Sequence, residues 1–258
     1  MKRLFVFVLA IISLLCVMPA TRYHIYTAFR GSDIDDTNHG WEVKKNKTHK
    51  QPDIPEQARA ILSKYKGVYV GDPESKSIYL TIDLGYESGN TKAVLDVLKR
   101  NNVKATFFIV SSYLENNPEI VDRIIDEGHS LQNHTANYRH LNGLTEYRIK
   151  REILDLHDAV QKEYGISMKY LRLPYEEWSE KVMKAASETG YKTVFWSVAC
   201  VDWVEGKEAA YIYNNVVENC HNGAVILLHA VSKTSADALN MIIKYLKDSS
   251  YQFRILDM

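Results

Sequence analysis

The chain of 258 residues carries 32 basic and 32 acidic side chains, so its formal net charge is zero, and 46% of its residues are hydrophobic. This apolar content excludes a disordered polypeptide, and the balanced charge gives no electrostatic case for binding nucleic acid. The length is typical of one large α/β domain, and a neutral sugar polymer is a compatible partner.

The first twenty residues are typical of an export signal. Lys2 and Arg3 precede an apolar run from Leu4 to Met18, which is shorter than the roughly 20 residues of a membrane-spanning helix. We therefore expect residues 1–20 to be a signal peptide or an uncleaved membrane anchor, and this segment alone to contact a membrane. The protein is accordingly expected to be extracytoplasmic, either secreted or anchored.

Residues 21–65 are polar and rich in turn-forming residues, and we expect a linker that wraps around the domain, with a short helix at about Pro55–Tyr65. Residues 66–258 form the predicted folded domain. Its two cysteines, Cys200 and Cys220, match neither a disulfide framework nor a usual zinc spacing, although a single bridge between them stays open.

Short apolar strands alternate with amphipathic helices along this domain. The expected strands are Ser77–Asp83, Ala105–Val110, Ser130–His134, Tyr170–Leu173, Lys192–Val198, Ala224–His229 and Phe253–Leu256. The expected helices are Asn90–Asn101, Pro118–Glu127, Thr145–Tyr164, Ser179–Thr189, Ala209–Asn219 and Ala236–Lys247. This alternation predicts parallel pairing with right-handed crossovers, and hence a distorted (β/α) barrel of about seven parallel strands. A doubly wound open sheet is the alternative fold.

Reactive side chains fall where these strands end. Asp83, His134, Arg172 and His229 lie at the ends of four strands, and Asp202 follows shortly after a fifth. In a parallel barrel the carboxyl ends of all strands open on one face, where such folds place their chemistry. The sequence therefore predicts one site that contains these five residues.

Five segments, in chain order, resemble the motifs of the polysaccharide deacetylases, the NodB-homology family also known as carbohydrate esterase family 4. They are Thr81–Gly85, Asn133–Thr135, Leu171–Tyr175, Phe195–Trp203 and Ile226–His229. Within that family, Gly40–Lys45, Tyr69–Asp72 and Gly85–Thr91 are similar to the delta-lactam-forming muramic-acid deacetylases of spore formers. The resemblance implies hydrolytic N-deacetylation of a cell-wall polysaccharide, with N-acetylmuramic acid in peptidoglycan of the spore-cortex type as the favoured substrate.

The resemblance also implies catalytic roles. Asp83 would be the general base that takes a proton from the attacking water, and Arg172 would keep Asp83 ionised, because a nearby cation favours a carboxylate. His229 would protonate the leaving amine, with Asp202 orienting its ring.

The implied substrate-binding residues are Pro174, Tyr175, Trp203 and Leu227. Leu227 would line the pocket for the acetyl methyl group, and the Tyr175 backbone N–H would serve the oxyanion. Outside this set, we expect Glu87 to be a solvated loop residue.

The metal site that the family implies is degenerate here. Its triad is Asp, His, His, and only His134 is kept, because Leu84 and Tyr138 occupy the other two ligand positions. His140 lies two residues beyond Tyr138 and could substitute only in a rebuilt loop. A divalent metal, zinc or a similar ion, is thus implied by the family but poorly supported by the donor set.

Two further functions remain open. The first is a catalytically weak or inactive deacetylase homologue that binds a glycan or a partner protein. The second is an esterase that removes O-acetyl groups from sugars with nearly the same residues. Glu176 stands where the family usually has glycine, and it would place a carboxylate near the rim of the site.

Overall fold

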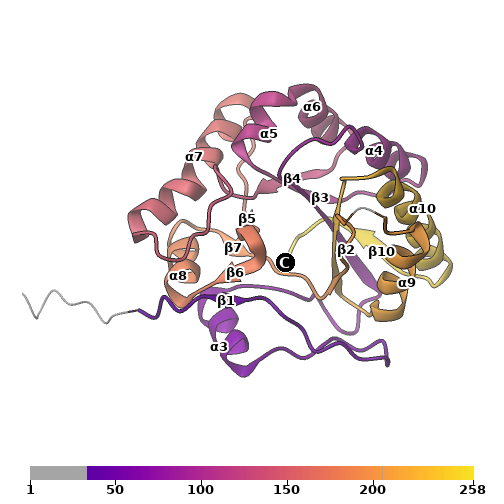
Figure 1. The fold of residues 1–258 in the computed structure, drawn as a ribbon, viewed down its shortest axis with the longest axis horizontal. Coiled ribbons are helices and arrows are strands. Elements are labelled where there is room, and N and C mark those ends of the chain that lie inside the picture. The colour runs from indigo at the N-terminus through magenta and orange to yellow at the C-terminus, as the bar shows by residue number, and fades with distance from the viewer. Residues whose placement is uncertain (1–33, 205) are drawn as a thin grey trace, which may run out of the picture. The chain divides into compact units, whose positions relative to one another are not determined.

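The core of the protein is a curled, wholly parallel sheet, and the expectation of a barrel of about seven parallel strands is confirmed (Figure 1). The computed structural model describes residues 34–204 and 206–258, so the predicted export segment lies outside the described residues. Seven strands follow one another in the order β7-β5-β4-β3-β2-β9-β8, and β10 pairs with β2 as an eighth within the described part. Their bounds are β2 Ser77–Leu84, β3 Thr106–Ile109, β4 Ser130–Asn133, β5 Tyr170–Leu171, β7 Lys192–Thr193, β8 Val198–Ala199, β9 Ala224–His229 and β10 Gln252–Arg254.

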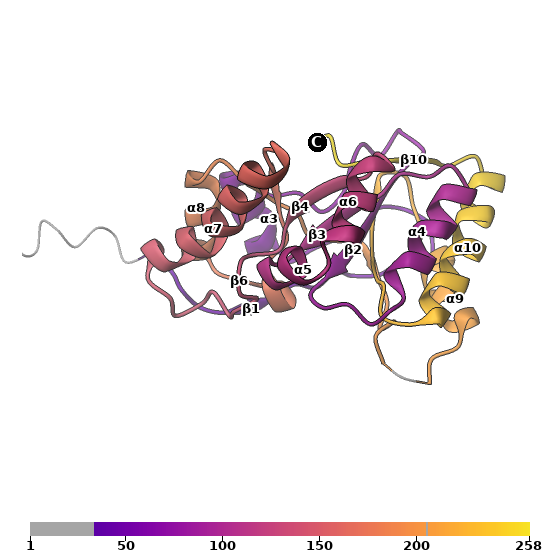
Figure 2. The same ribbon diagram turned by 90° about the horizontal axis from the view of Figure 1, so that it is seen from above.

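Helices pack around the outside of this sheet, as Figures 1 and 2 show from two directions. They are α3 Glu56–Tyr65, α4 Thr91–Arg100, α5 Ser111–Asn116, α6 Pro118–Asp126, α7 Glu146–Tyr164, α8 Glu180–Glu188, α9 Ala209–Asn219 and α10 Lys233–Asp248. The two ends of helix α7 show the local signals that start and stop such a helix. The Thr145 side chain accepts a hydrogen bond from the Arg148 N–H at its start, and Gly165 ends it in the left-handed conformation. None of the helices in the described part is long and apolar enough to cross a membrane.

The prediction of a single strand over Lys192–Val198 is wrong. It is divided into β7 and β8, which lie at opposite ends of the strand order. The residues between them cross the gap, where the Phe195 N–H donates to the Val68 carbonyl and the Ser197 N–H donates to the Val225 carbonyl. The apolar run 192–198 therefore connects the two edges of the sheet. A crossing segment of this kind has the same apolar pattern as a single buried strand, so periodicity alone does not distinguish the two.

The expected wrap is part of the folded unit from Asp36 onward, because contacts group residues 36–258 together. Strand β1 (His39–Gly40) pairs antiparallel with β6 (Glu177–Trp178). Trp41 stacks on Phe195 with ring centroids 4.2 Å apart, and its Nε1–H donates to the Trp196 carbonyl at 2.8 Å. This N-terminal strap, residues 36–44, packs beside the segment that carries Tyr175 and Glu176.

Cys200 and Cys220 are both buried and unbridged, so the open possibility of a disulfide between them is not realised. Burial raises the pKa of each thiol to about 12, which keeps both protonated and unreactive.

Candidate active site

The register of β2 and β9 places two of the predicted residues side by side. Asp83 is the direct partner of His229, and Thr81 is the partner of Leu227. Partners on neighbouring parallel strands share a face of the sheet, and every second residue of a strand returns to that face. Asp83 and His229 therefore form an upper layer at the carboxyl ends of the strands, with Thr81 and Leu227 one layer below.

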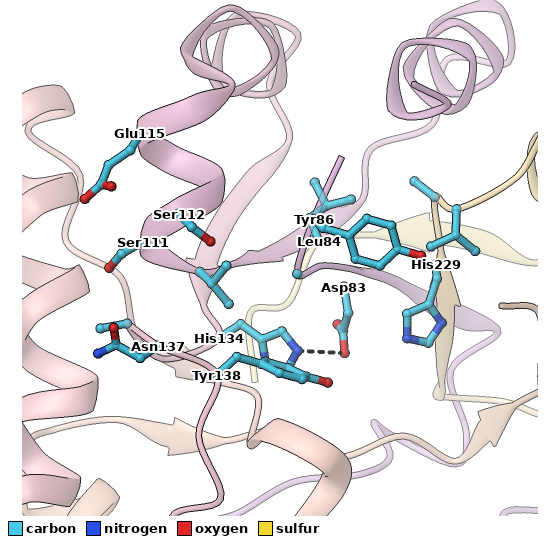
Figure 3. Close-up of a pocket in the computed structure, with 15 residues that line it drawn as sticks. Asp83, Leu84, Tyr86, Ser111, Ser112, Glu115, His134, Asn137, Tyr138 and His229 are labelled. Carbon is cyan, nitrogen blue, oxygen red and sulfur yellow. Dashed lines mark ion pairs between the residues drawn. The ribbon is translucent and has the colours of Figure 1, made fainter. Parts of the chain in front are cut away.

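His134 follows β4 and faces Asp83 from the other side, as Figure 3 shows. Its Nε2 lies 3.6 Å from Asp83 Oδ2, and its Nδ1 lies 2.9 Å from the Arg172 carbonyl oxygen. A carbonyl only accepts, so Nδ1 carries the proton and the neutral ring presents the Nε2 lone pair toward Asp83. Burial lowers the pKa of His134, which favours this neutral form.

Arg172 lies wholly buried beneath these residues. Its Nε is 3.9 Å from Asp83 Oδ2, its Nη2–H donates to Thr81 Oγ1 at 2.9 Å, and its guanidinium lies 5.0 Å from the Phe108 ring centroid. Arg172 Nε and Nη1 and Asp83 Oδ1 are buried without a hydrogen-bond partner in the described structure. Arg172 is thus the counter-charge of Asp83, and Asp83 keeps one acceptor oxygen unused.

His229 is oriented by Asp202. Asp202 Oδ1 lies 2.9 Å from His229 Nδ1, and Asp202 Oδ2 accepts the His229 backbone N–H at 2.8 Å. Burial by itself lowers the pKa of His229, but the hydrogen bond and the charge of Asp202, helped by Asp83, raise it above its ordinary value. With Nδ1 held by Asp202, Nε2 is the nitrogen available to a substrate.

Two cavities meet at this centre, of about 490 Å³ and about 430 Å³. Both are lined by Asp83, Tyr86, His134, Tyr138, His229 and Val231. The larger one extends past Ser111, Ser112, Glu115 and Asn137, which Figure 3 shows on the far side of His134. The smaller one is walled by Leu173, Tyr175, Glu176 and Trp203.

The predicted substrate-binding residues divide into two groups. Tyr175 and Trp203 are exposed and line the smaller cavity, and the Trp203 ring lies 4.9 Å from the His229 ring. Pro174 and Leu227 are buried and line neither cavity. The position of Leu227 differs from the expectation, because it lies two residues before His229 on the same strand face and hence one layer deeper. Leu173 lines the smaller cavity instead.

The donor atoms present do not fit the family's divalent metal. Asp83 and His134 supply one carboxylate and one imidazole, whereas Leu84 is a buried aliphatic side chain. Burial and the Asp83 charge raise the pKa of Tyr138 to about 12, so Tyr138 is a neutral phenol rather than a phenolate ligand. Among the described residues no group of three His, Cys, Asp or Glu side chains could hold a metal ion, and catalytic zinc sites usually use three.

His140 does not replace the histidine ligand that is missing at Tyr138. Its ring stacks on Tyr175 with centroids 4.0 Å apart, and its Nδ1 lies 2.7 Å from Glu177 Oε2. Tyr175 in turn lies 4.8 Å from the Tyr138 ring. The histidine therefore supports the aromatic wall of the smaller cavity from outside.

Two glutamates, Glu87 and Glu176, make contacts that the spacing of the sequence motifs does not predict. Glu87 is not a solvated loop residue, because its carboxylate accepts hydrogen bonds from Gly89 N–H, Thr91 Oγ1 and Tyr113 O–H, and so holds the start of α4. Glu176 adopts a left-handed backbone conformation (φ 59°) and accepts a hydrogen bond from Trp196 Nε1. Burial raises the pKa of Glu176 despite the opposing charge of Arg172. The only sequence signal for it is the replacement of the family's glycine.

Comparisons with known proteins agree on one family. The polysaccharide deacetylase family model matches residues 70–194. Peptidoglycan-N-acetylmuramic acid deacetylase PdaA of Bacillus subtilis (strain 168) is 39% identical over 220 residues, which cover 84% of this chain and 84% of that protein. The solved structure of PdaA, a family 4 carbohydrate esterase, matches with a TM-score of 0.82 and 38% identity over 86% of this chain and 96% of that one.

More distant relatives include a second peptidoglycan deacetylase and a pseudoenzyme of the same family. Peptidoglycan-N-acetylglucosamine deacetylase of Bacillus cereus is 37% identical over 196 residues, or 74% of this chain and 71% of that protein. A mutant of a CE4 family pseudoenzyme from Bacillus anthracis, described as having restored enzymatic activity, matches with a TM-score of 0.69 and 25% identity over 72% of this chain and 68% of that one. The motif resemblance is thus confirmed: this chain belongs to the polysaccharide deacetylase family, carbohydrate esterase family 4, which includes hydrolases that act on carbon–nitrogen bonds in peptidoglycan deacetylation.

Proposed function

We propose that this protein removes the acetyl group from N-acetylmuramic acid in peptidoglycan of the spore-cortex type, outside the cytoplasm. The observation that carries the chemistry is the pairing of Asp83 with His229 on adjacent strands, each supported by its own buried partner, Arg172 and Asp202. The likeness to PdaA supports the choice of sugar. The apolar segment Leu4–Met18 supports the location, through a cleaved signal or an anchor.

Asp83 and His229 divide the proton transfers between them. The unpartnered Oδ1 of Asp83 accepts a proton from a water molecule, whose oxygen then attacks the acetamide carbonyl carbon. His229, protonated through its pairing with Asp202, donates its Nε2 proton to the sugar nitrogen as the carbon–nitrogen bond breaks. Acetate and a free amine leave, and general acid–base assistance of this kind contributes about 10²–10⁴ in rate.

Tyr175 and Trp203 supply the sugar contacts. Both are exposed aromatic side chains on the wall of the smaller cavity, and aromatic faces pack well against the apolar faces of sugar rings. The Tyr175 ring lies 4.8 Å from the Tyr138 ring, and the Trp203 ring lies 4.9 Å from the ring of His229, the proposed acid. They would hold the acetylated sugar with its acetamide over Asp83.

Acetate release from purified peptidoglycan tests this function. The full-length protein should release acetate from glycan strands, with Asp83→Asn inactive because an amide cannot act as the base. Parallel assays on N-acetylglucosamine oligomers and on an O-acetylated sugar distinguish the muramic acid substrate from the two neighbouring substrate classes. Release from either alternative substrate alone would contradict the proposed specificity.

The second candidate function is an inactive homologue that binds glycan. It is favoured by one observation, the replacement of two family metal ligands by Leu84 and Tyr138. Sedimentation with insoluble peptidoglycan by both the wild-type protein and Asp83→Asn, without acetate release by either, would support this candidate and exclude the enzyme.

A further inference from the structure

The phenol of Tyr138 lies at the centre of the site, where a metal ligand would stand in the family pattern. Tyr138 lines both cavities, and its ring meets the His134 ring edge-on with centroids 4.9 Å apart. Figure 3 shows its hydroxyl end directed to the space beside the Asp83 carboxylate. A substrate carbonyl that approaches Asp83 therefore meets the Tyr138 hydroxyl.

The loop around Tyr138 fixes this position at some cost in backbone energy. Thr135 and Tyr138 both have positive φ angles, 69° and 52°, and the Tyr138 N–H donates to Thr135 Oγ1 at 3.2 Å. Non-glycine residues adopt this region at a cost of about 1–3 kcal/mol and usually only where the surroundings hold them there. The buried Asn133 side chain holds the turn by accepting the Thr135 N–H at 2.8 Å.

The proton of the phenol is available to a substrate. Burial raises the pKa of Tyr138 to about 12, so the phenol keeps its O–H. Asp83 Oδ1 has no hydrogen-bond partner in the described structure, so the phenol does not donate its proton to that oxygen.

We propose that Tyr138 is a catalytic hydrogen-bond donor that stands in for the metal: its O–H holds the carbonyl oxygen of the scissile acetamide and stabilises the oxyanion that forms there. The proposal rests on the deacetylase function proposed above. As the water oxygen bonds to the carbonyl carbon, the π electrons of the C=O bond move to the oxygen held by Tyr138, and the water proton passes to Asp83. When the carbon–nitrogen bond breaks, those electrons restore the carbonyl of acetate and His229 protonates the nitrogen.

The family resemblance implies that the Tyr175 backbone N–H serves the oxyanion. In this proposal the Tyr138 hydroxyl is a second donor to the same oxygen. Removing one such preorganised donor typically lowers kcat by about 10²–10³.

The test uses full-length wild-type protein, Tyr138→Phe, Tyr138→His and the control Tyr147→Phe, whose ring is exposed on α7 away from the site. Acetate release is measured after exhaustive chelation and again with added Zn²⁺, and Zn²⁺ binding is measured by calorimetry. We expect chelated wild type and Tyr147→Phe to be active, and Tyr138→Phe to lose about 10²–10³ in kcat with little change in KM. Tyr138→His should bind Zn²⁺ more tightly than wild type and need it for activity, while thermal unfolding confirms that each variant is folded.

Each contrary result overturns a different statement. Full activity of chelated Tyr138→Phe would remove the role of the phenol and leave the deacetylase function intact. Loss of wild-type activity on chelation with recovery on Zn²⁺ would show a metal enzyme and overturn the proposal. A wild type that releases no acetate under any condition would overturn both the proposal and the function on which it rests.

Discussion

Asp83 and His229 are direct partners in the register of β2 and β9, so the proposed base and acid sit on neighbouring strands and face the same cavities. Their polar supports come from elsewhere in the chain. Arg172 rises from the end of β5 beneath Asp83, and Asp202 holds His229 from the loop after β8. Asp83 and His229 can therefore be tested separately, by substitutions of Arg172 and of Asp202.

Asp202→Asn should shift the pH profile of catalysis. Burial lowers the pKa of His229, and the hydrogen bond and charge of Asp202 raise it above 6.5, so removing that charge brings the pKa down. A proposed acid must be protonated, so the alkaline limb of kcat/KM should move to lower pH, and kcat should fall by about 10²–10⁴. An alkaline limb that stays in place in the variant would exclude His229 as the group that titrates there.

Arg172→Met should destabilise the fold by about 3–5 kcal/mol, because it leaves the buried Asp83 charge without its partner. Urea unfolding at neutral pH measures the loss. The double variant Arg172→Met with Asp83→Asn should recover part of it, since no unpaired charge then remains. Arg100→Met is the control, because Arg100 is exposed at the end of α4, and its effect should stay within about 0.5 kcal/mol. A double variant no more stable than Arg172→Met would contradict the pairing.

Glu176→Gln should change how stability depends on pH. The folded-state pKa of Glu176 is raised above 4.5 by burial, so the folded protein keeps this proton at pH values where the unfolded chain has released it. Wild-type stability from this group is therefore full below pH 4.5 and is lost as pH rises through the folded-state pKa. The variant should be more stable than wild type at pH 7, and the difference should close below pH 4.5.

Thermal unfolding across this pH range provides the measurement. Glu74→Gln, at an exposed turn position, is the matched control and should leave the stability curve unchanged. Equal stability of wild type and Glu176→Gln at every pH would show that Glu176 is not desolvated as the fold indicates.

The N-terminal segment can be tested by fractionation. Because Lys2 and Arg3 precede the apolar run Leu4–Met18, full-length protein should be exported or recovered with membranes, and a chain of residues 21–258 should be soluble. Immunoblots of cell fractions would decide this. Recovery of full-length protein wholly in the cytosol of its native cell would contradict the proposed location.

Much of the fold could be predicted because its helices and strands bury regular faces. In α7, Ile149, Ile153, Leu156 and Val160 recur at helical spacing and are all fully buried. Strand ends could be read in the same way, since polar residues such as Asp83 follow apolar runs. These local signals place residues on elements, and the parallel pairing of the elements then gathers them at one face.

The remainder depended on tertiary structure. Helix α5 has only six residues and directly follows the apolar run of β3, so it is too short to show a helical periodicity that would distinguish it from the strand. The division into β7 and β8 and the depth of Leu227 follow from how the sheet curls. The contact of the Glu87 carboxylate with the Tyr113 hydroxyl joins the loop before α4 to α5, 26 residues further along the chain. None of these relationships has a signature within a short window of sequence.

The pairing of the central strand β2 affects the order in which the sheet can assemble during folding. Its first residues pair with β10 (Gln252–Arg254) and its length pairs with β9, whereas β3 follows β2 closely in the chain. Contacts this distant in sequence form late, since the intervening chain must first be closed into a loop. The strand that carries Asp83 therefore gains its last neighbour only after β10 has been synthesised. A chain that stops before β10 leaves backbone groups of β2 unpaired and exposes an edge for aggregation.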